Sequence, residues 1–256
     1  MTQTERRKFL IEYLLAEHGE RINIPTDEHN QKRLLRSLFN IRMPRETSEA
    51  FLRVQDDYLQ EENHRKGITD IADLQPIKDD IYLWQGDITT LKCGAIVNAA
   101  NSQMLGCFQP CHDCIDNAIH TFSGIQLRNV CNELMQKQGH NELTGQAKLT
   151  PAYNLPCQYV IHTVGPIVQG YLTETDCELL KSCYLSCLKI AEENSVESIA
   201  FCCISTGVFG FPQREATQIA VDTVNEYKVE TGSNIKMVFN VFKDEDYTIY
   251  NELLRS

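Results

Sequence analysis

The chain has little positive charge, no long apolar run and no low-complexity segment, and each absence excludes a class of protein. It carries 24 Lys and Arg against 35 Asp and Glu, a formal net charge of −11, whereas nonspecific binding to nucleic acid requires a basic surface. No stretch approaches the roughly 18 apolar residues of a membrane span, and the first residues are charged where a signal peptide would be apolar. We therefore expect a cytoplasmic protein that binds neither nucleic acid nor membrane.

The acidic charge is concentrated in the later part of the chain. Residues 1–70 hold 12 Lys and Arg against 13 Asp and Glu, whereas residues 71–256 hold 12 against 22. If the ligand of that later part is an anion, the positive potential must come from backbone N–H groups or a metal ion.

The eleven cysteines are many for a chain without a signal segment. Disulfide scaffolds are typically short and extracellular, so we expect these cysteines to be core residues, metal ligands or nucleophiles in a reducing compartment. Cys183 and Cys187 lie one helical turn apart on an apolar stripe, and Cys202 and Cys203 lie within an apolar run. We assign these four to the core, where cysteine behaves as a small hydrophobic residue.

Residues 1–70 are predicted to form a helical extension. Apolar residues recur on one face of a first helix that ends near Gly19, and Thr26 or Asp27 is expected to cap a second helix that ends by Pro44. A third helix is expected over residues 47–65. The region holds no cluster of catalytic residue types, so we expect it to pack against the core and form one rim of a cleft.

From residue 71 onward, short β-rich segments alternate with helical patterns. Several of the β-rich segments are apolar throughout, which is typical of strands buried on both faces. This alternation predicts a three-layer α/β/α domain with a mixed central sheet over residues 71–256. The predicted strands are 81–84, 95–97, 159–164, 198–204 and 236–242, and the predicted helices are 116–138, 174–194 and 213–229.

Three polar motifs follow predicted strands. Gly86-Asp87 either forms an ordinary turn or provides a carboxylate, from Asp87, that accepts a hydrogen bond from a base. The segment with Asn98 and Asn101 forms either an Asn-rich turn or a polar recess. The stretch Ser205–Pro212 places glycines and hydroxyls before a helix, as an anion site does, but lacks the lysine of a P-loop. Because ligands bind beyond the carboxyl ends of strands, one shared pocket would account for all three motifs.

The stretch 98–124 contains the most distinctive cluster of the chain. Cys107, His112 and Cys114 lie within eight residues of one another, and Asp116 follows two positions later. Two thiols and an imidazole are donors that zinc prefers, and three protein ligands with an open fourth position are typical of catalytic zinc. Asp116 is placed to act as a general base near the metal or to cap the helix that follows, and the two roles are compatible.

The ordered set of motifs resembles macrodomains of the ADP-ribose hydrolase type. The segments GDIT, NAANS, CIDNAIH, VIHTVGP and STGVFGFP begin at residues 86, 98, 114, 160 and 205 and fall within a region of resemblance that spans roughly residues 80–243. In place of the glycine-rich run of common hydrolytic macrodomains, residues 105–114 read LGCFQPCHDC. This insertion resembles the zinc-containing subclass of macrodomains, which also carries an N-terminal helical extension.

The resemblance implies a zinc ion bound by Cys107, His112 and Cys114, whereas Cys111 has no place in the pattern and is taken as incidental. It also implies that ADP-ribose is the ligand. Asp87 and Ile88 would hold the adenine, and Asn98, Asn101 and the metal segment would face the distal ribose, with Asp116 and Asn101 as catalytic residues. The diphosphate loop would comprise Ser205, Thr206, Gly207, Val208, Phe209 and Gly210.

The implied activity is zinc-dependent removal of mono-ADP-ribose from a modified protein side chain, by an enzyme expected to be monomeric. The subclass further suggests a lipoyl carrier protein, modified by a sirtuin-like transferase, as the substrate. Two alternatives stay open, since all three functions share one pocket and the fold does not separate them. The first is a noncatalytic reader of ADP-ribose with a structural zinc, and the second is a deacylase of O-acyl-ADP-ribose.

Overall fold

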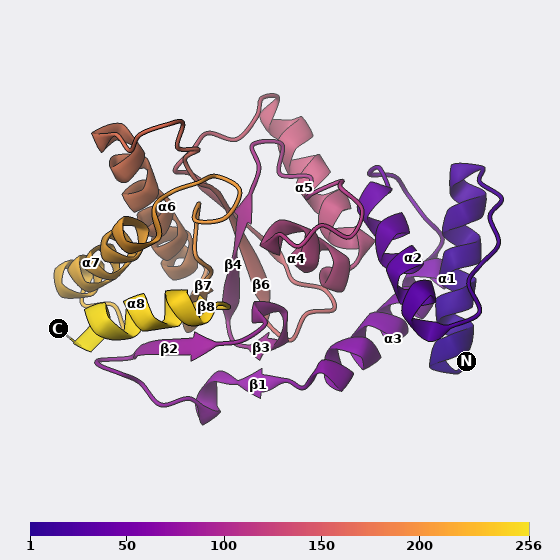
Figure 1. The fold of residues 1–256 in the computed structure, drawn as a ribbon, viewed down its shortest axis with the longest axis horizontal. Helices are drawn as coiled ribbons and strands as arrows, with labels where there is room; N and C mark the ends of the chain where they lie inside the picture. The colour runs from indigo at the N-terminus through magenta and orange to yellow at the C-terminus, as the bar shows by residue number, and fades with distance from the viewer. Residues whose placement is uncertain (256) are drawn as a thin grey trace.

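The computed structural model describes residues 1–255, in which a six-stranded sheet is covered by helices on both faces and three further helices lie at one end (Figure 1). The strand order is β2-β8-β7-β4-β6-β5, and every neighbouring pair is parallel except β5 and β6. The predicted three-layer fold with a mixed sheet is therefore confirmed. The strands are β2 (Ile81–Gln85), β4 (Ala95–Ala100), β5 (Ala147–Pro151), β6 (Tyr159–Val164), β7 (Ser198–Phe201) and β8 (Lys236–Val241).

Some strand boundaries differ from the prediction, because an apolar segment does not end where its strand ends. Strand β4 continues through Ala100, so Asn98 lies inside the strand instead of following it, and β7 ends at Phe201, before Cys202. Strand β5 was not predicted because it is an edge strand of intermediate burial that ends in a proline. Two residues of β1 (Thr69–Asp70) pair with β3 (Leu91–Lys92) in a separate small sheet.

Helices cover the two faces of the sheet unequally. Figure 1 shows α6, α7 and α8 grouped on one side and α4 and α5 on the other. The single helix predicted over residues 116–138 is wrong, because the chain breaks at Gly124, whose φ of 101° is unfavourable for other residues. Helix α8 was not predicted. The bounds are α4 (Ile115–Ser123), α5 (Ile125–Gln138), α6 (Glu174–Glu193), α7 (Gln213–Thr231) and α8 (Asp244–Arg255), with short 3₁₀ turns η1 (Ile71–Asp73) and η2 (Ile88–Thr90).

The three predicted N-terminal helices are confirmed as α1 (Gln3–His18), α2 (Glu28–Ile41) and α3 (Glu49–Lys66). Asp27 caps α2 by accepting the backbone N–H of Asn30, and Gly19 ends α1 in the left-handed conformation. The helices bury an apolar cluster of their own, to which Ile125 of α5 also belongs. Because α2 packs directly on α4, the extension is attached to the helical layer that begins at the cysteine-rich loop.

The cysteines follow the prediction for a chain without disulfides. All eleven are free thiols, and Cys183, Cys187 and Cys202 are buried in the main apolar core. Cys203 is partly buried and packs against the same core. The cytoplasmic location stays a prediction.

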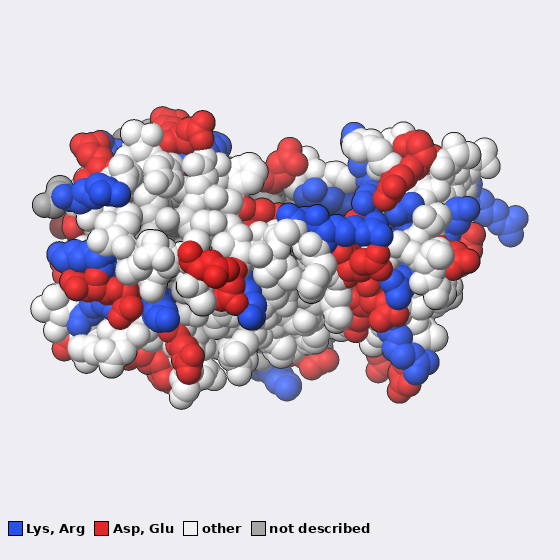
Figure 2. All heavy atoms as spheres, turned by 90° about the horizontal axis from the view of Figure 1, so that it is seen from below, with Lys and Arg blue, Asp and Glu red and all other residues white. Residues whose placement is uncertain are grey.

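The surface fits the charge pattern of the sequence. Figure 2 shows acidic and basic side chains interspersed at both ends of the face that it displays, with a largely uncharged area between them. The row of basic side chains to the right of the centre of this face is short and bordered by acidic ones, unlike the extended basic surface that follows a phosphate backbone. Within residues 1–255, no helix has the length and apolar character that a membrane crossing requires.

Candidate active site

The predicted site residues gather along the carboxyl edge of the parallel strands. Gly86, which follows β2, donates its N–H to the carbonyl of Val241 at the end of β8 (3.0 Å). The segment after β6 and the loop after β7 are also joined, since the N–H of Val168 donates to the carbonyl of Phe209 (2.9 Å). Gly165 lies so close to Ser205 that a Cβ at this glycine would overlap the Ser205 hydroxyl. Segments that are far apart in the sequence therefore lie side by side at this edge of the sheet.

Asp87 is the N-cap of η2. Its Oδ1 accepts hydrogen bonds from the backbone N–H (2.9 Å) and the hydroxyl (2.6 Å) of Thr89, and its Oδ2 accepts from Nζ of Lys66 (3.0 Å). Burial opposes ionisation of this carboxyl, but Lys66 and the Thr89 hydrogen bonds outweigh it, so the pKa of Asp87 is lowered. Ile88 is only 2% exposed and belongs to the core, so a ligand could contact its backbone alone.

The loop after β7 has the backbone geometry expected of an anion site. Ser205 adopts a left-handed φ of 65° and accepts the N–H of Phe211 on its carbonyl (3.0 Å), which closes the loop immediately before α7. Among residues 1–255, no side chain caps the first turn of α7, so its N–H groups stay available. Val208 is 77% exposed at the tip of the loop, and Phe211 is buried in the core.

The structure adds two residues to this edge that the sequence reasoning missed. Phe242 directly follows β8, which pairs with β2, and is 75% exposed. An exposed aromatic ring at the end of a buried strand is a suitable surface for stacking a base. Lys66 comes from the last turn of α3, where a basic residue also fits the helix dipole, and its ammonium lies 3.0 Å from the centre of the Phe122 ring.

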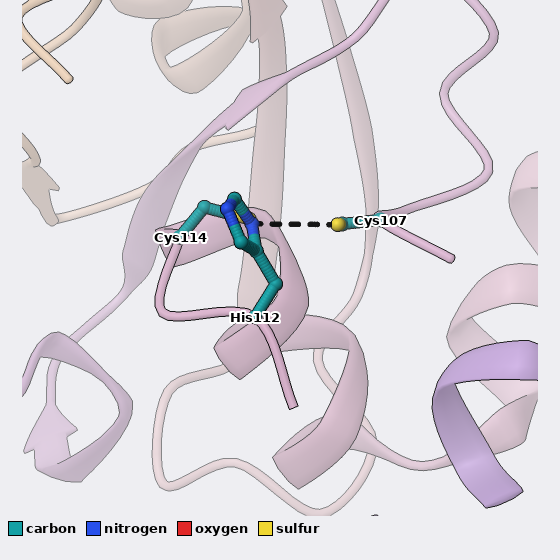
Figure 3. Close-up of side chains that lie close together, drawn as sticks. All are labelled: Cys107, His112 and Cys114. Atoms are coloured by element: carbon teal, nitrogen blue, oxygen red, sulfur yellow. Dashed lines mark hydrogen bonds between the residues drawn. The ribbon is translucent and has the colours of Figure 1, made fainter. Parts of the chain in front are cut away.

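Cys107, His112 and Cys114 form a cluster at the entrance to α4. Figure 3 shows the imidazole of His112 turned toward Cys107, with Nδ1 3.6 Å from the Sγ atom. One donor atom from each of the three residues lies within 4.8 Å of the others. Cys114 is also the N-cap of α4, since its Sγ accepts the N–H of Asn117 (3.4 Å), so the cap role considered for Asp116 belongs to Cys114.

The donor set and its spacing fit a zinc ion. Tetrahedral zinc lies about 2.3 Å from a thiolate and about 2.0–2.1 Å from an imidazole nitrogen, which separates these two ligand atoms by about 3.6 Å. The distance from Cys107 Sγ to His112 Nδ1 is 3.6 Å. Asp113 is exposed and lies outside the cluster, so three protein ligands are available within the described residues.

Asp116 lies behind this cluster, in the first turn of α4, and is 5% exposed. Its Oδ1 accepts from Nδ2 of Asn98 (2.8 Å) and its Oδ2 from Nδ2 of Asn101 (3.4 Å), so the two predicted catalytic residues are brought together. Burial raises the pKa of Asp116 to about 6. Asn98 is completely buried, so it orients Asp116, and its predicted contact with a ribose stays a prediction.

A second group of candidate ligands, His120, Cys131 and His162, lies deeper in the core. Both nitrogens of His162 are already engaged, one with Nδ2 of Asn98 (3.1 Å) and the other with the hydroxyl of Thr150 (3.0 Å). Burial lowers the pKa of His162 to about 3 and also lowers that of His120. We therefore interpret His162 as a neutral hydrogen-bonded support for Asn98 and not as a metal ligand.

Comparisons with known proteins agree with this architecture. The Macro domain family model matches residues 97–220. Over 99% of this chain and 100% of its own length, a protein of Treponema medium named protein-ADP-ribose hydrolase is 61% identical. A protein of Staphylococcus aureus strain MSSA476 with the same name is 50% identical over 98% of this chain and 97% of its own length.

Two solved structures have the same fold. The Trypanosoma brucei macrodomain in complex with ADP-ribose is 30% identical, with a TM-score of 0.66 over 85% of this chain and 94% of its own. An Oceanobacillus iheyensis macrodomain mutant with ADPR is 35% identical, with a TM-score of 0.63 over 71% of this chain and 96% of its own. Taken with the full-length relatives, these matches show that the chain belongs to the macrodomain family.

Proposed function

We propose that this protein is a protein-ADP-ribose hydrolase that uses zinc bound by Cys107, His112 and Cys114. The observation that carries the proposal is the juxtaposition of this metal-type cluster with the Asp116–Asn101 pair at the strand edge. The names of the relatives at 61% and 50% identity over nearly the whole chain support the substrate class. The zinc requirement is supported by the donor set and by the 3.6 Å spacing of Sγ and Nδ1.

Three parts of the carboxyl edge of the sheet suit three parts of an extended ADP-ribose molecule. Asp87 and Phe242, at the ends of two paired strands, suit the adenine as hydrogen-bond acceptor and stacking surface. The loop 205–210 precedes the free N–H groups of α7 and suits the diphosphate. The remaining polar groups, Asn101 and Asp116 with the cluster, are left to face the distal ribose and the linked side chain.

When bound, zinc would act as a Lewis acid at the distal ribose or its water. The protein's own part is to place a proton acceptor beside the bond that breaks. Water supplies a hydroxyl to the carbon at the linkage, one proton of that water passes to Asp116, and the departing side-chain oxygen or nitrogen takes a proton in return. Asn101 donates to both Asp116 and the carbonyl of Gly106 (3.1 Å), so it joins the carboxylate to the backbone directly before Cys107.

The test combines metal content with product release. Full-length protein is assayed for zinc and for free ADP-ribose released from mono-ADP-ribosylated proteins with Asp/Glu-, Ser- and Arg-linked marks, with and without a chelator. A modified lipoyl carrier protein belongs in the same panel. We expect Cys107→Ser to lose both zinc and hydrolysis, and Cys177→Ser, a partly buried cysteine on α6, to lose neither.

The alternatives give different results in the same experiment. A noncatalytic reader with a structural zinc would bind ADP-ribose and release none from any substrate. A deacylase would act on O-acyl-ADP-ribose and leave the protein-linked panel intact. Full hydrolysis by Cys107→Ser with no zinc bound would exclude the metal mechanism.

A further inference from the structure

We propose that helix α2 of the N-terminal extension holds the ligand loop, residues 107–114, in its metal-binding shape, with Arg36 and Asn40 as positioning residues. The inference rests on the proposed zinc site and assigns a role to a region in which the sequence indicated only packing. These two residues are four apart on α2 and therefore project from the same face of the helix. That face packs on α4, whose first turn carries Cys114 as its cap.

Asn40 reaches the middle of the ligand loop. Its Oδ1 accepts the backbone N–H of Cys111 (2.9 Å), while its Nδ2 donates to the hydroxyl of Thr121 on α4 (2.9 Å). Asn40 is completely buried, so this side chain has one conformation available and both ends of its amide are used. It therefore fixes the backbone between Cys107 and His112 relative to α4.

Cys111 is at the point where the loop needs such support. Its backbone has a left-handed φ of 52°, which costs free energy in a residue other than glycine. Its thiol contacts the carbonyl of Arg33 on α2 (3.4 Å) and lies outside the Cys107–His112–Cys114 cluster. Cys111 is thus an anchor of the loop on α2, and the left-handed turn next to His112 is maintained by contacts from the extension.

Arg36 acts at the two ligands closest to α4. Its Nη2 donates to the backbone carbonyl of His112 (2.8 Å), and both Nη2 and Nε donate to Oδ1 of Asn117 (2.9 and 3.2 Å). Asn117 in turn donates its Nδ2 to the carbonyl of Gln109 (3.0 Å) and its backbone N–H to the Sγ of Cys114 (3.4 Å). One guanidinium therefore restrains His112 directly and Cys114 through Asn117.

These contacts predict an effect on metal retention more than on folding. Residues that orient metal ligands without touching the metal typically change its affinity by about 10- to 100-fold when removed. The adenine end of the edge is built from β2 and β8, which are not connected to Arg36 or Asn40 by these hydrogen bonds. Binding of ADP, which lacks the distal ribose, should therefore be unaffected.

The experiment compares Arg36→Ala and Asn40→Ala with Arg33→Ala, an exposed arginine on the same helix. The zinc dissociation constant of the full chain is measured by competition with a chromophoric chelator, and the visible spectrum of the cobalt-substituted protein reports the geometry at the site. We expect zinc affinity to fall by about 10- to 100-fold in the two test variants and to stay unchanged in the control.

The outcomes separate this inference from the proposed function. Zinc affinities within twofold of the unsubstituted protein in both alanine variants, with unchanged cobalt spectra, would overturn the role of α2 and leave the zinc site intact. Absence of zinc binding in the unsubstituted protein would overturn both. If Asn40→Ala does not fold, as judged by the fluorescence of the single tryptophan, Trp84, the partly exposed Arg36 decides the question alone.

Discussion

Arg128→Met tests how firmly the N-terminal extension is joined to the macrodomain. The Arg128 guanidinium is buried and donates Nη1 to the carbonyls of Phe39 (3.0 Å), Asn40 (2.8 Å) and Arg42 (2.6 Å) at the end of α2. Its Nε donates to the carbonyl of Leu105 (2.7 Å), next to the ligand loop. The guanidinium thus satisfies three carbonyl groups at the end of α2, where helical carbonyls lack an intrahelical partner, and one in the loop before α4.

The magnitude follows from these four acceptors. Leaving a buried acceptor unpaired costs about 1–3 kcal/mol, so the four together cost about 4–12 kcal/mol. Burial of the guanidinium lowers the pKa of Arg128 to about 10. The substitution removes the penalty of burying this cation, which amounts to several kcal/mol and offsets part of the loss. We expect a net loss of about 3–5 kcal/mol in the free energy of unfolding, a large part of the roughly 5–15 kcal/mol of a typical domain.

Urea unfolding followed by two probes measures this loss. Fluorescence of the single tryptophan, Trp84 in β2, reports the sheet, and far-UV circular dichroism reports all helices. If Arg128 joins the two parts, the dichroism transition of the variant should begin at lower urea than the fluorescence transition. Arg214→Met, which breaks an exposed ion pair with Glu252, is the control. A loss no larger than that of the control, with coincident transitions, would refute the reasoning.

Three further predictions concern the residues at the carboxyl edge of the sheet. Phe242→Ala should weaken ADP-ribose binding by about 5- to 150-fold in calorimetric titration, corresponding to the roughly 1–3 kcal/mol of a base stacked on an aromatic ring. Val229→Ala, which removes another exposed apolar side chain on α7, should leave the affinity unchanged, and equal affinities in the two variants would argue against stacking. Asp116→Asn should keep ADP-ribose affinity and lower kcat by about 10²- to 10⁴-fold, and loss of binding together with activity would contradict a chemical role. Gly165→Ala should displace Ser205 and reduce ADP-ribose affinity, and an unchanged dissociation constant would show that the loop adapts.

Local sequence patterns predicted most elements because their physical basis is local. The caps at Asp27 and Gly19 were sufficient for the boundaries of the N-terminal helices. The alternation of strands and helices after residue 71 and the apolar strand segments were sufficient for the three-layer fold. The errors occurred where tertiary contacts outweigh local preference. The helix break at Gly124 accommodates Gln55 of α3, since a Cβ at Gly124 would lie 2.7 Å from Nε2 of that side chain.

The site was predictable to the extent that its residues are close in sequence. Cys107, His112 and Cys114 were found by spacing, because a short loop keeps its donors near one another. Phe242 was missed because an aromatic residue at a strand end is usually part of the core, and only its 75% exposure distinguishes it. Ionisation states also required the structure, since the raised pKa of Asp116 results from its burial in the folded chain, against the opposing effect of the hydrogen bond from Asn98.

The sequence by itself determined most of the secondary structure, the family resemblance and the identity of the three zinc-type donors, since each depends on residue types at fixed spacing. The tertiary structure decided which distant residues support them. Arg36 and Asn40 are more than 65 positions from the groups they bind in the ligand loop, and nothing in their local sequence marks them. Their partners are known only once α2 packs on α4, because a hydrogen bond between distant segments depends on the position of both backbones.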